Sequence, residues 1–404
     1  MIRAKQFLLG SAAALATVTG ANAADLPMTK AEPVEYVKVC SEFGTGYFYI
    51  PGSDTCLQLG GYVRSDFYYV EPKKRSDNAS QWQGRAQVRW DARTATEYGT
   101  LRSYIAIDAD YGAAWASTSN SSFKVHYAYL QFGGVTAGFI ESAFNFYDGK
   151  YGSPIYATYG GEQGRKNILS YTGQFGGGLS ATLSVEDSIE HNTSIAGFGG
   201  LTDKDDAART GYGGSRMPDF VANVAYDGGK GGWGKAQVMG AVHQVRGVLD
   251  DYSSKYGYAV GAALQMNIPF AAGGYFVIEG EYADGASGYT GANKFQKAPD
   301  AYAGPGPGFA FETAKSWSIE GEAGFNLTPS LLAIAFGSYR NFDAPSIIAD
   351  KGNDYTAWVA GGQLVYTVVK GMTVAGEVSY QSIDVTGKST VDTWAGAMRV
   401  RRSF

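Results

Sequence analysis

The chain has 404 residues, a formal net charge of −5 and a large share of small and aromatic side chains, with 56 glycines, 29 tyrosines and 21 phenylalanines. The negative balance argues against a nucleic-acid partner, and so many aromatic side chains exclude a disordered chain. No stretch beyond the N-terminal segment is apolar enough for a transmembrane helix. Composition leaves two classes, a secreted all-β protein and a transmembrane β-barrel, whose alternating strands average out in any hydropathy window.

Residues 1–23 have the pattern of a secretory signal peptide. Arg3 and Lys5 precede an apolar run over 7–18, and small residues ending at Ala23 follow it. The apolar run is too short to span a bilayer, and the small residues form a cleavage site. We expect cleavage after Ala23, which removes two positive charges and takes the net charge from −5 to −7.

Cys40 and Cys56 are the two cysteines of the chain. A metal site would need further ligands, and no histidine lies close in the sequence. In the oxidising compartment that the signal peptide implies, a disulfide is the better interpretation. Closing so short a loop contributes roughly 3 kcal/mol. We expect residues 24–56 to form an N-terminal, plug-like periplasmic segment containing this disulfide, followed by a barrel over 57–404.

The clearest strand pattern lies over residues 81–94. Its even positions are small or apolar, and its odd positions are polar and include Arg85, Arg89 and Arg93. A soluble β-sandwich could also alternate in this way, but its core would use bulkier side chains than the many glycines and alanines found here. An arginine facing lipid near the bilayer midplane costs about 2–4 kcal/mol. The three arginines are therefore predicted to face a wet lumen.

The same alternation recurs along the chain and predicts sixteen strands. Long polar inserts (141–166, 187–217 and 284–315) alternate with short connections, as in outer-membrane barrels. This predicts an all-β fold, a transmembrane antiparallel β-barrel. The predicted strands are 57–69, 81–94, 100–111, 122–132, 134–140, 167–175, 179–186, 218–226, 233–243, 257–267, 274–283, 316–327, 331–342, 355–368, 371–383 and 391–404.

The last predicted strand ends the chain on Phe404. A closed barrel has no free edge, so this strand must pair with the first one. Its apolar face ends in Phe404, where an aromatic side chain suits the membrane interface. Its other face carries Arg399 and Arg401.

Both ends of the mature chain resemble known sequences. The terminal phenylalanine after alternating apolar residues resembles the signal that outer-membrane proteins present to their assembly machinery, although Arg402 stands where that signal usually has an apolar residue. The segments ADLP and VCSEFGTGYFYIPGSDTCLQLGGYVRSDFYY resemble the alphaproteobacterial porin family. The resemblance implies a homotrimeric, sixteen-stranded general diffusion porin in outer-membrane lipid, without a cofactor. It also implies a constriction loop folded into the lumen after the fifth strand.

The charged residues predicted to face inward are unevenly distributed. Basic residues gather on the first three strands and the last, which closure makes neighbours: Arg64, Arg85, Arg89, Arg93, Arg102, Arg399 and Arg401. Acids gather roughly across the ring at Glu279, Glu281, Glu320 and Glu322. The expected constriction loop carries Glu141, Asp148 and Glu162. These charges predict a waist whose transverse field favours hydrophilic solutes; alternatively, they only keep the lumen wet.

Two other functions stay open at this point. An outer-membrane enzyme such as a lipase would need a serine–histidine pair at the rim, and no G-x-S-x-G motif occurs. A channel specific for sugars would need a file of aromatic side chains beside polar groups in the lumen, which the many tyrosines allow. We expect a non-enzymatic channel for passive diffusion of small hydrophilic solutes and ions.

Overall fold

The structure is a computed structural model that describes residues 38–112, 120–146, 155, 164–197, 211–229, 231–248, 254–271, 273–291, 298–303, 311–345 and 354–404. The predicted signal peptide, 1–23, lies outside these residues. The chain divides into two units, Met1–Lys38 and Val39–Phe404, and the fold below is that of the second.

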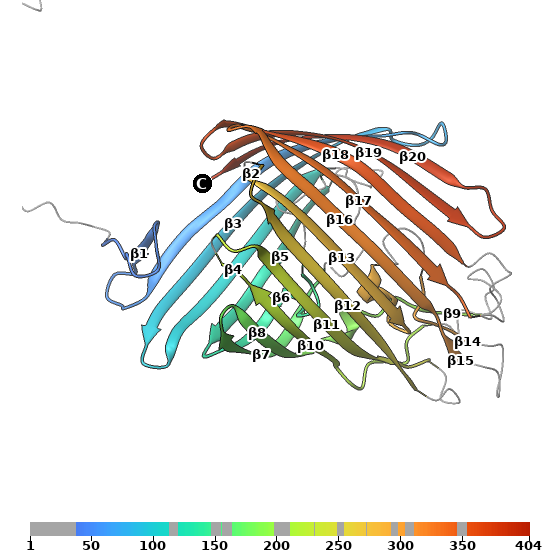
Figure 1. The fold of residues 1–404 in the computed structure, drawn as a ribbon, viewed down its shortest axis with the longest axis horizontal. Coiled ribbons are helices and arrows are strands. Elements are labelled where there is room, and N and C mark those ends of the chain that lie inside the picture. Colours follow the sequence, from blue (N-terminus) through green and yellow to red (C-terminus); the bar gives the residue numbers. More distant parts are fainter. Residues whose placement is uncertain are drawn as a thin grey trace, which may run out of the picture. The chain divides into compact units, whose positions relative to one another are not determined.

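Sixteen antiparallel strands form a closed barrel, which confirms the predicted fold class. Each strand pairs with its neighbours in the chain, and β20 pairs with β2 to close the ring (Figure 1). Each strand begins and ends within two residues of its prediction. In chain order the strands are β2 (Cys56–Val70), β3 (Ser80–Thr96), β4 (Gly99–Gly112), β5 (Asn120–Phe132), β6 (Val135–Glu141), β7 (Arg165–Gly176), β8 (Leu179–Glu186), β10 (Asp219–Asp227), β11 (Gly234–Val245), β12 (Lys255–Ile268), β13 (Gly274–Asp284), β16 (Lys315–Thr328), β17 (Leu331–Asp343), β18 (Tyr355–Val369), β19 (Met372–Val385) and β20 (Val391–Ser403).

The barrel has one end of short turns and one end of long connections. Gly133 and Gly134 form the whole turn between β5 and β6, with φ of 56° and 88°. Two successive positive φ values are what a two-residue hairpin requires, and glycine adopts them without steric cost. The C-terminus lies at the same end as the short turns, on the left of Figure 1. This is the alternation predicted from the lengths of the inserts.

The closing seam between β2 and β20 is held by both backbone and side chains. The backbone groups of Gly61 and Phe404 exchange two hydrogen bonds of 3.1 Å. A Cβ at Gly61 would lie 2.1 Å from the carbonyl oxygen of Gln87 on β3, so only glycine fits there. Five residues further along the seam, Arg399 donates two hydrogen bonds to Asp66, at 2.6 and 3.0 Å. The predicted pairing of the last strand with the first is confirmed.

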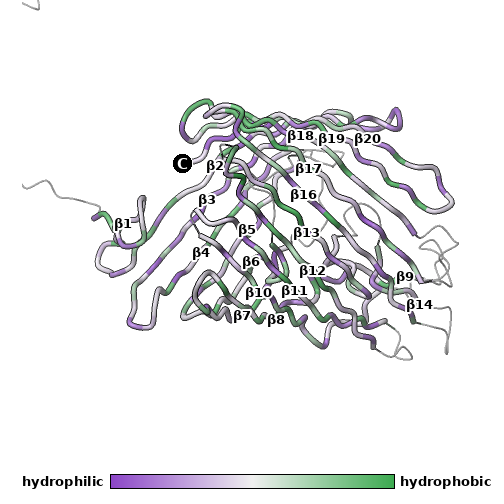
Figure 2. The backbone as a smooth tube through the Cα atoms, in the orientation of Figure 1, coloured by the Kyte–Doolittle hydropathy of each residue, from purple (hydrophilic) through white to green (hydrophobic). Residues whose placement is uncertain are grey.

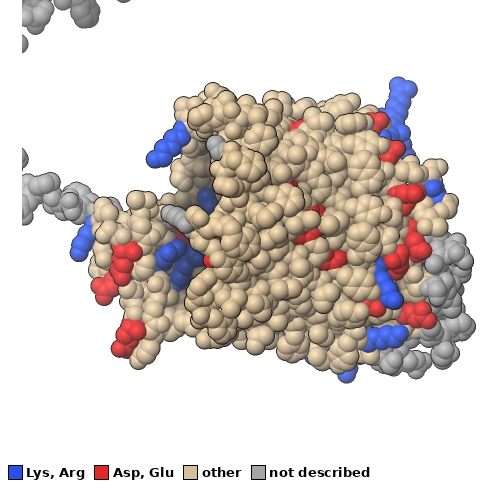
Figure 3. Space-filling view, viewed as in Figure 1, with Lys and Arg blue, Asp and Glu red and all other residues tan. Residues whose placement is uncertain are grey.

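Side chains alternate between an apolar outer face and a polar inner face (Figure 2). On β3, Trp82 and Val88 are exposed on the outside, whereas Gln87 and Asp91 are buried within. The face seen in Figure 3 is mostly uncharged between the two ends of the barrel. Among the described residues, no helix is long and apolar enough to cross a membrane.

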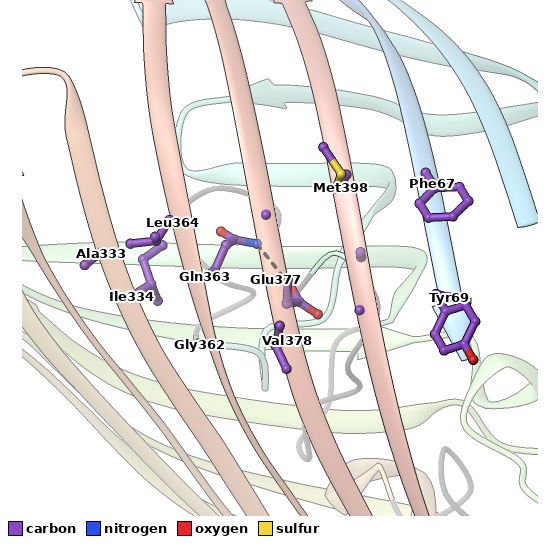
Figure 4. A pocket seen from close by; sticks show the side chains of 13 residues that line it. Phe67, Tyr69, Ala333, Ile334, Gly362, Gln363, Leu364, Glu377, Val378 and Met398 are labelled. Carbon is purple, nitrogen blue, oxygen red and sulfur yellow. Dashed lines mark hydrogen bonds between the residues drawn. The ribbon is translucent and has the colours of Figure 1, made fainter. Parts of the chain in front are cut away.

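An apolar groove runs over the outer face of the last strands and β2. Gly362, Gly376 and Gly396 leave it without side chains along part of its floor. The outward side chains at its sides include Phe67, Tyr69, Leu364, Val378 and Met398 (Figure 4). Its volume is about 590 Å³. A surface of this kind suits hydrocarbon, because the transfer of apolar surface from water to an apolar environment is favourable.

The predicted disulfide is present at the end with the short turns. Cys40 and Cys56 are bonded, with their Cα atoms 6.0 Å apart. A short strand, β1 (Tyr47–Tyr49), pairs with the start of β2. The guanidinium of Arg93 lies 6.0 and 5.2 Å from the ring centres of Phe43 and Tyr47. The described part of the N-terminal segment thus contacts the inner wall at this end of the barrel, and residues 24–37 lie outside the described range.

Candidate functional site: the channel interior

The connection after the fifth barrel strand, β6, folds into the lumen. Its backbone at Ala143 donates to the Glu186 carboxylate at 2.8 Å and accepts from the Asn223 side chain at 2.6 Å. Both partners lie on inward positions of the wall, on β8 and β10. Phe144 is fully buried against side chains of β10 to β13. The loop predicted after the fifth strand is therefore confirmed.

The same loop reaches a second part of the wall. The N–H of Ile155 donates to the carboxylate of Glu377 on β19, which also accepts from Gln363 at 3.1 Å (Figure 4). The Ile155 side chain is buried in a cluster with inward side chains of β17 and β18, among them Ile334 and Val359. Because the loop is attached at β8–β11 and at β17–β19, it narrows the path through the barrel.

The seven predicted arginines lie on the inner face of β2, β3, β4 and β20. Their positions alternate with exposed outward side chains such as Val63 and Val400. Strand register places Arg64 directly opposite Arg401 on one side and Arg85 on the other. We call Arg401, Arg64 and Arg85 the arginine row. The set on the inner face is Arg64, Arg85, Arg89, Arg93, Arg102, Arg399 and Arg401.

The wall is mixed rather than purely basic, which corrects the prediction. Arg85 binds Asp110 with two hydrogen bonds, at 2.5 and 3.0 Å, and its guanidinium also lies 3.2 Å from Asp108. Arg93 and Arg102 share Asp91, each with two hydrogen bonds of 2.8 to 3.0 Å. Two-pronged arginine–carboxylate pairs are short and directional. The acids that sequence reasoning left out of this wall are Asp66, Asp91, Asp108 and Asp110.

Aromatic side chains lie beside several of these arginines. Arg102 lies 5.0 and 5.5 Å from the ring centres of Tyr104 and Tyr129, which stack on each other at 5.2 Å. Arg165 lies 4.7 Å from the ring centre of Tyr127. Cation–π contacts between arginine and tyrosine contribute about 0.5–2 kcal/mol each.

His126 also contacts this wall. A register shift between β4 and β5 leaves it without a partner residue on β4, and its Nδ1 lies 2.9 Å from Asp108.

The four predicted glutamates point inward but are covered. Glu279, Glu281, Glu320 and Glu322 are only 2–4% exposed, so they do not line open water as expected. Ser318 donates to Glu281 at 2.6 Å, and Tyr275 donates to Glu322. Arg340 on β17 is fully buried and lies opposite Ser318, where it interacts electrostatically with Glu281 and Glu320. Alternation fixes which face is inside, but it cannot tell what covers that face.

One of the three predicted loop acids can be placed. Glu141 ends β6, accepts from the Tyr127 hydroxyl and lies 3.3 Å from the Arg165 guanidinium. Asp148 and Glu162 lie outside the described residues.

A buried polar cluster joins the two longest connections at the other end of the barrel. Asp219 accepts from His243 at 2.8 Å and from the Tyr289 hydroxyl at 2.8 Å, and His191 lies 2.9 Å away. Tyr212 donates to Asp300 at 2.5 Å, and its oxygen lies 3.0 Å from His243 Nε2. The carboxylates of Asp219, at 2.8 Å, and Asp300, at 3.9 Å, both face the His243 ring and favour its cationic form.

Burial, together with the Asp300 charge, raises the pKa of the Tyr212 hydroxyl, which keeps its proton and remains a donor. Asp300 also accepts from the backbone of Thr193 and Ser287, at 3.0 and 2.6 Å. A three-stranded sheet joins the same connections, formed by β9 (Ile195–Gly197), β14 (Ala301–Ala303) and β15 (Phe311–Thr313). We call this cluster the loop latch; its members are His191, Tyr212, Asp219, His243, Tyr289 and Asp300.

A closed barrel with an apolar outer belt, a charged interior and its own loop in the lumen defines a channel protein of the outer membrane. The chain belongs to the family described as the porin subfamily, whose family model matches residues 25–400. It is thus an outer-membrane porin, a channel for passive diffusion, and its family indicates a channel rather than an enzyme.

Comparison with individual proteins supports the same assignment. The chain is 29% identical over 414 residues to porin Omp2b of Brucella neotomae and of Brucella suis biovar 1, with 99% of each chain covered. The outer-membrane channel DcaP of Acinetobacter baumannii has the same fold, with a TM-score of 0.71 at 16% identity over 88% of this chain and 99% of that one. Salmonella typhi OmpF, solved with daunomycin, gives 0.56 at 12% identity, covering 87% and 98%.

Proposed function

We propose that this porin passes small hydrophilic solutes and ions without a preferred substrate and catalyses no reaction. The observation that carries the proposal is the mixed charged wall beside a loop that narrows the lumen. Seven arginines against four aspartates leave this wall with an excess of positive charge. We propose that the predicted loop acids, Glu141, Asp148 and Glu162, supply the acidic side of the waist. A field across a narrow aqueous path favours solutes that keep polar contacts and disfavours apolar ones.

Single-channel recording in a planar bilayer tests this proposal. Wild-type protein should give step-like conductance, and solutes of increasing size should set a cut-off. Replacing Arg85, Arg89 and Arg93 by glutamine should raise cation preference in a salt gradient. Arg402→Gln is the control, because Arg402 is exposed on the outer face of β20 beside Arg401. An unchanged reversal potential and conductance in the triple variant would show that these arginines do not line the waist.

We also propose that the chain is exported with cleavage after Ala23, recognised by the assembly machinery through Phe404, and assembled as a homotrimer in outer-membrane lipid. The exposed Phe404 side chain at the seam supports recognition there, since 66% of it remains accessible. A Vibrio cholerae OmpT structure described as a trimer form has the same fold at a TM-score of 0.50. The mass of the detergent-solubilised protein, measured by light scattering, should be three times that of the mature chain; a monomer mass contradicts the trimer.

A sugar-selective channel is the second candidate. It is favoured by the stacked Tyr104 and Tyr129 with Arg102 at the inner wall, since aromatic faces and guanidinium groups together bind sugar rings and hydroxyls. Blocking of the single-channel current by a sugar at low concentration would support this candidate. Equal currents with sugars of similar size favour the general channel.

A further inference from the structure

One part of the inner wall carries positive charge without matching carboxylates. We propose that Arg64, Arg89 and Arg401, grouped around Tyr62, form a binding site for a dianionic oxyanion, namely inorganic phosphate or a phosphate monoester. The proposal rests on the proposed function, because the anion reaches this site through the lumen. We call these four residues the Tyr62 site.

Strand register brings the members of the Tyr62 site together. Arg64 lies opposite Arg401, and inward residues opposite one another on adjacent strands have Cβ atoms about 4.5–5.5 Å apart. The guanidinium of Arg401 lies 4.2 Å from the centre of the Tyr62 ring, and that of Arg64 lies 5.7 Å from it. Arg89 lies opposite Gly60, which contributes no side chain, and it is close enough to Arg401 for electrostatic repulsion.

Each of the other inner arginines forms an ion pair with a carboxylate of the wall, although Arg93 and Arg102 share one. Arg85 binds Asp110, Arg93 and Arg102 bind Asp91, and Arg399 binds Asp66 with both its prongs. Arg64 has only a share in the same Asp66, at 3.1 Å. Within the part of the chain that the structure describes, Arg89 and Arg401 form no ion pair.

This arrangement is unfavourable without a ligand. Like charges directly opposite one another on neighbouring strands are destabilising. The Nε of Arg401 is in addition buried and has no hydrogen-bond acceptor among the described residues. A buried donor without a partner costs free energy. An anion with several acceptor oxygens would remove the repulsion and satisfy this donor together.

The charge and the donor geometry define the ligand class. Guanidinium groups present rigid pairs of N–H donors that match the oxygens of phosphate or carboxylate. Two uncompensated cations and a third that shares its carboxylate correspond to a doubly charged anion. Chloride has one charge and no oxygens to accept paired hydrogen bonds. It should therefore bind more weakly at this site and pass through the channel.

The test uses the wild-type channel in a planar bilayer at constant ionic strength, with chloride replaced stepwise by inorganic phosphate. Bound phosphate should reduce the chloride current along a saturating curve. Removing one charged hydrogen-bond donor costs about 1.5–3 kcal/mol, so the midpoint should rise about ten- to hundredfold in Arg89→Gln and in Arg401→Gln. Arg401→Lys keeps the charge but loses the two-pronged geometry. Its midpoint should therefore lie between those of wild type and Arg401→Gln. Arg93→Gln is the matched control on the same strand as Arg89, and its midpoint should stay within about threefold of wild type, as expected for a screened charge.

Each outcome decides the proposal. A current that falls linearly with phosphate, or an equal shift in Arg93→Gln, overturns the Tyr62 site in favour of general wall charge. If Arg401→Gln does not fold, Arg89→Gln, which lies off the seam, decides alone. If wild type gives no step-like conductance, the channel function itself fails, and calorimetric titration of phosphate into the folded protein in detergent then tests the site. Saturable binding weakened in Arg89→Gln supports it, and no binding overturns it.

Discussion

The loop latch should hold the two longest connections in place independently of the barrel. The change that tests this is Asp219→Asn, at the first residue of β10. Asp219 is fully buried and contacts His243, His191 and Tyr289. Removing one partner of a buried, hydrogen-bonded charge pair costs about 3–5 kcal/mol, because the remaining charge stays buried without compensation. Here the remaining group is the His243 ring, which keeps only Asp300, 3.9 Å from its Nε2.

Hydrogen exchange followed by mass spectrometry measures this effect locally. Peptides over 188–197 and 298–303 contain β9 and β14 and should lose protection by about two to four orders of magnitude, the ratio that 3–5 kcal/mol implies. Peptides of β17 to β19 should keep theirs, since their hydrogen bonds do not involve the latch.

The control is Asp227→Asn at the last residue of the same strand. Asp227 forms an ion pair with Lys235 at 2.7 Å, with both side chains about half exposed. Surface pairs of this kind contribute about 0–1 kcal/mol, so the exchange of the same peptides should stay close to wild type. Equal exchange in both variants would refute the latch. Loss of protection throughout the barrel would show instead that Asp219 supports the barrel itself.

Three further outcomes are expected. In membranes, cysteines introduced at Arg85, Arg89 and Arg93 should react with a small water-soluble thiol reagent and those at Ala86 and Val88 should not; the opposite pattern refutes the orientation of β3. Thiol labelling of the denatured, unreduced protein should find no free thiol, and two labelled cysteines would contradict the bond between Cys40 and Cys56. Glu377→Ala removes the acceptor of the Ile155 N–H and should raise single-channel conductance. Ser379→Ala, two residues along the same inner face, should not. Equal conductance in wild type and both variants means that this attachment does not narrow the pore.

The strands could be predicted because a membrane barrel imposes one simple constraint on every spanning residue. Each position faces either lipid or water, and the cost of a charge in lipid makes the alternation clear even at β20, where Arg399 and Arg401 alternate with Met398 and Val400. The same constraint gave the orientation of β3. The bond between Cys40 and Cys56 was predicted on a separate ground, since two cysteines in an exported chain leave one pairing.

The partners within the lumen could not be predicted in the same way. Asp110 binds Arg85 because β3 and β4 pair with a particular stagger, and alternation does not determine stagger. Alternation places the glutamates of β13 and β16 on the inner face, but it does not determine whether they are open to water or covered. The loop latch was missed because His191, His243 and Asp300 are far apart in the sequence, and each histidine alone gives no signal.

Closure of the barrel and the charge of its interior depend partly on the same side chains. Asp66 joins β2 to β20 through Arg399 and also neutralises part of Arg64, so removing its charge would weaken the seam and raise the positive charge of the lumen together. Arg89 and Arg401 differ, because neither forms an ion pair among the described residues and the backbone bonds of the seam do not need their charge. Sequence change at these two positions can therefore alter which anions the channel holds at little cost to closure. At Asp66 the same freedom does not exist, since a buried pair that loses one partner leaves an uncompensated charge in the wall.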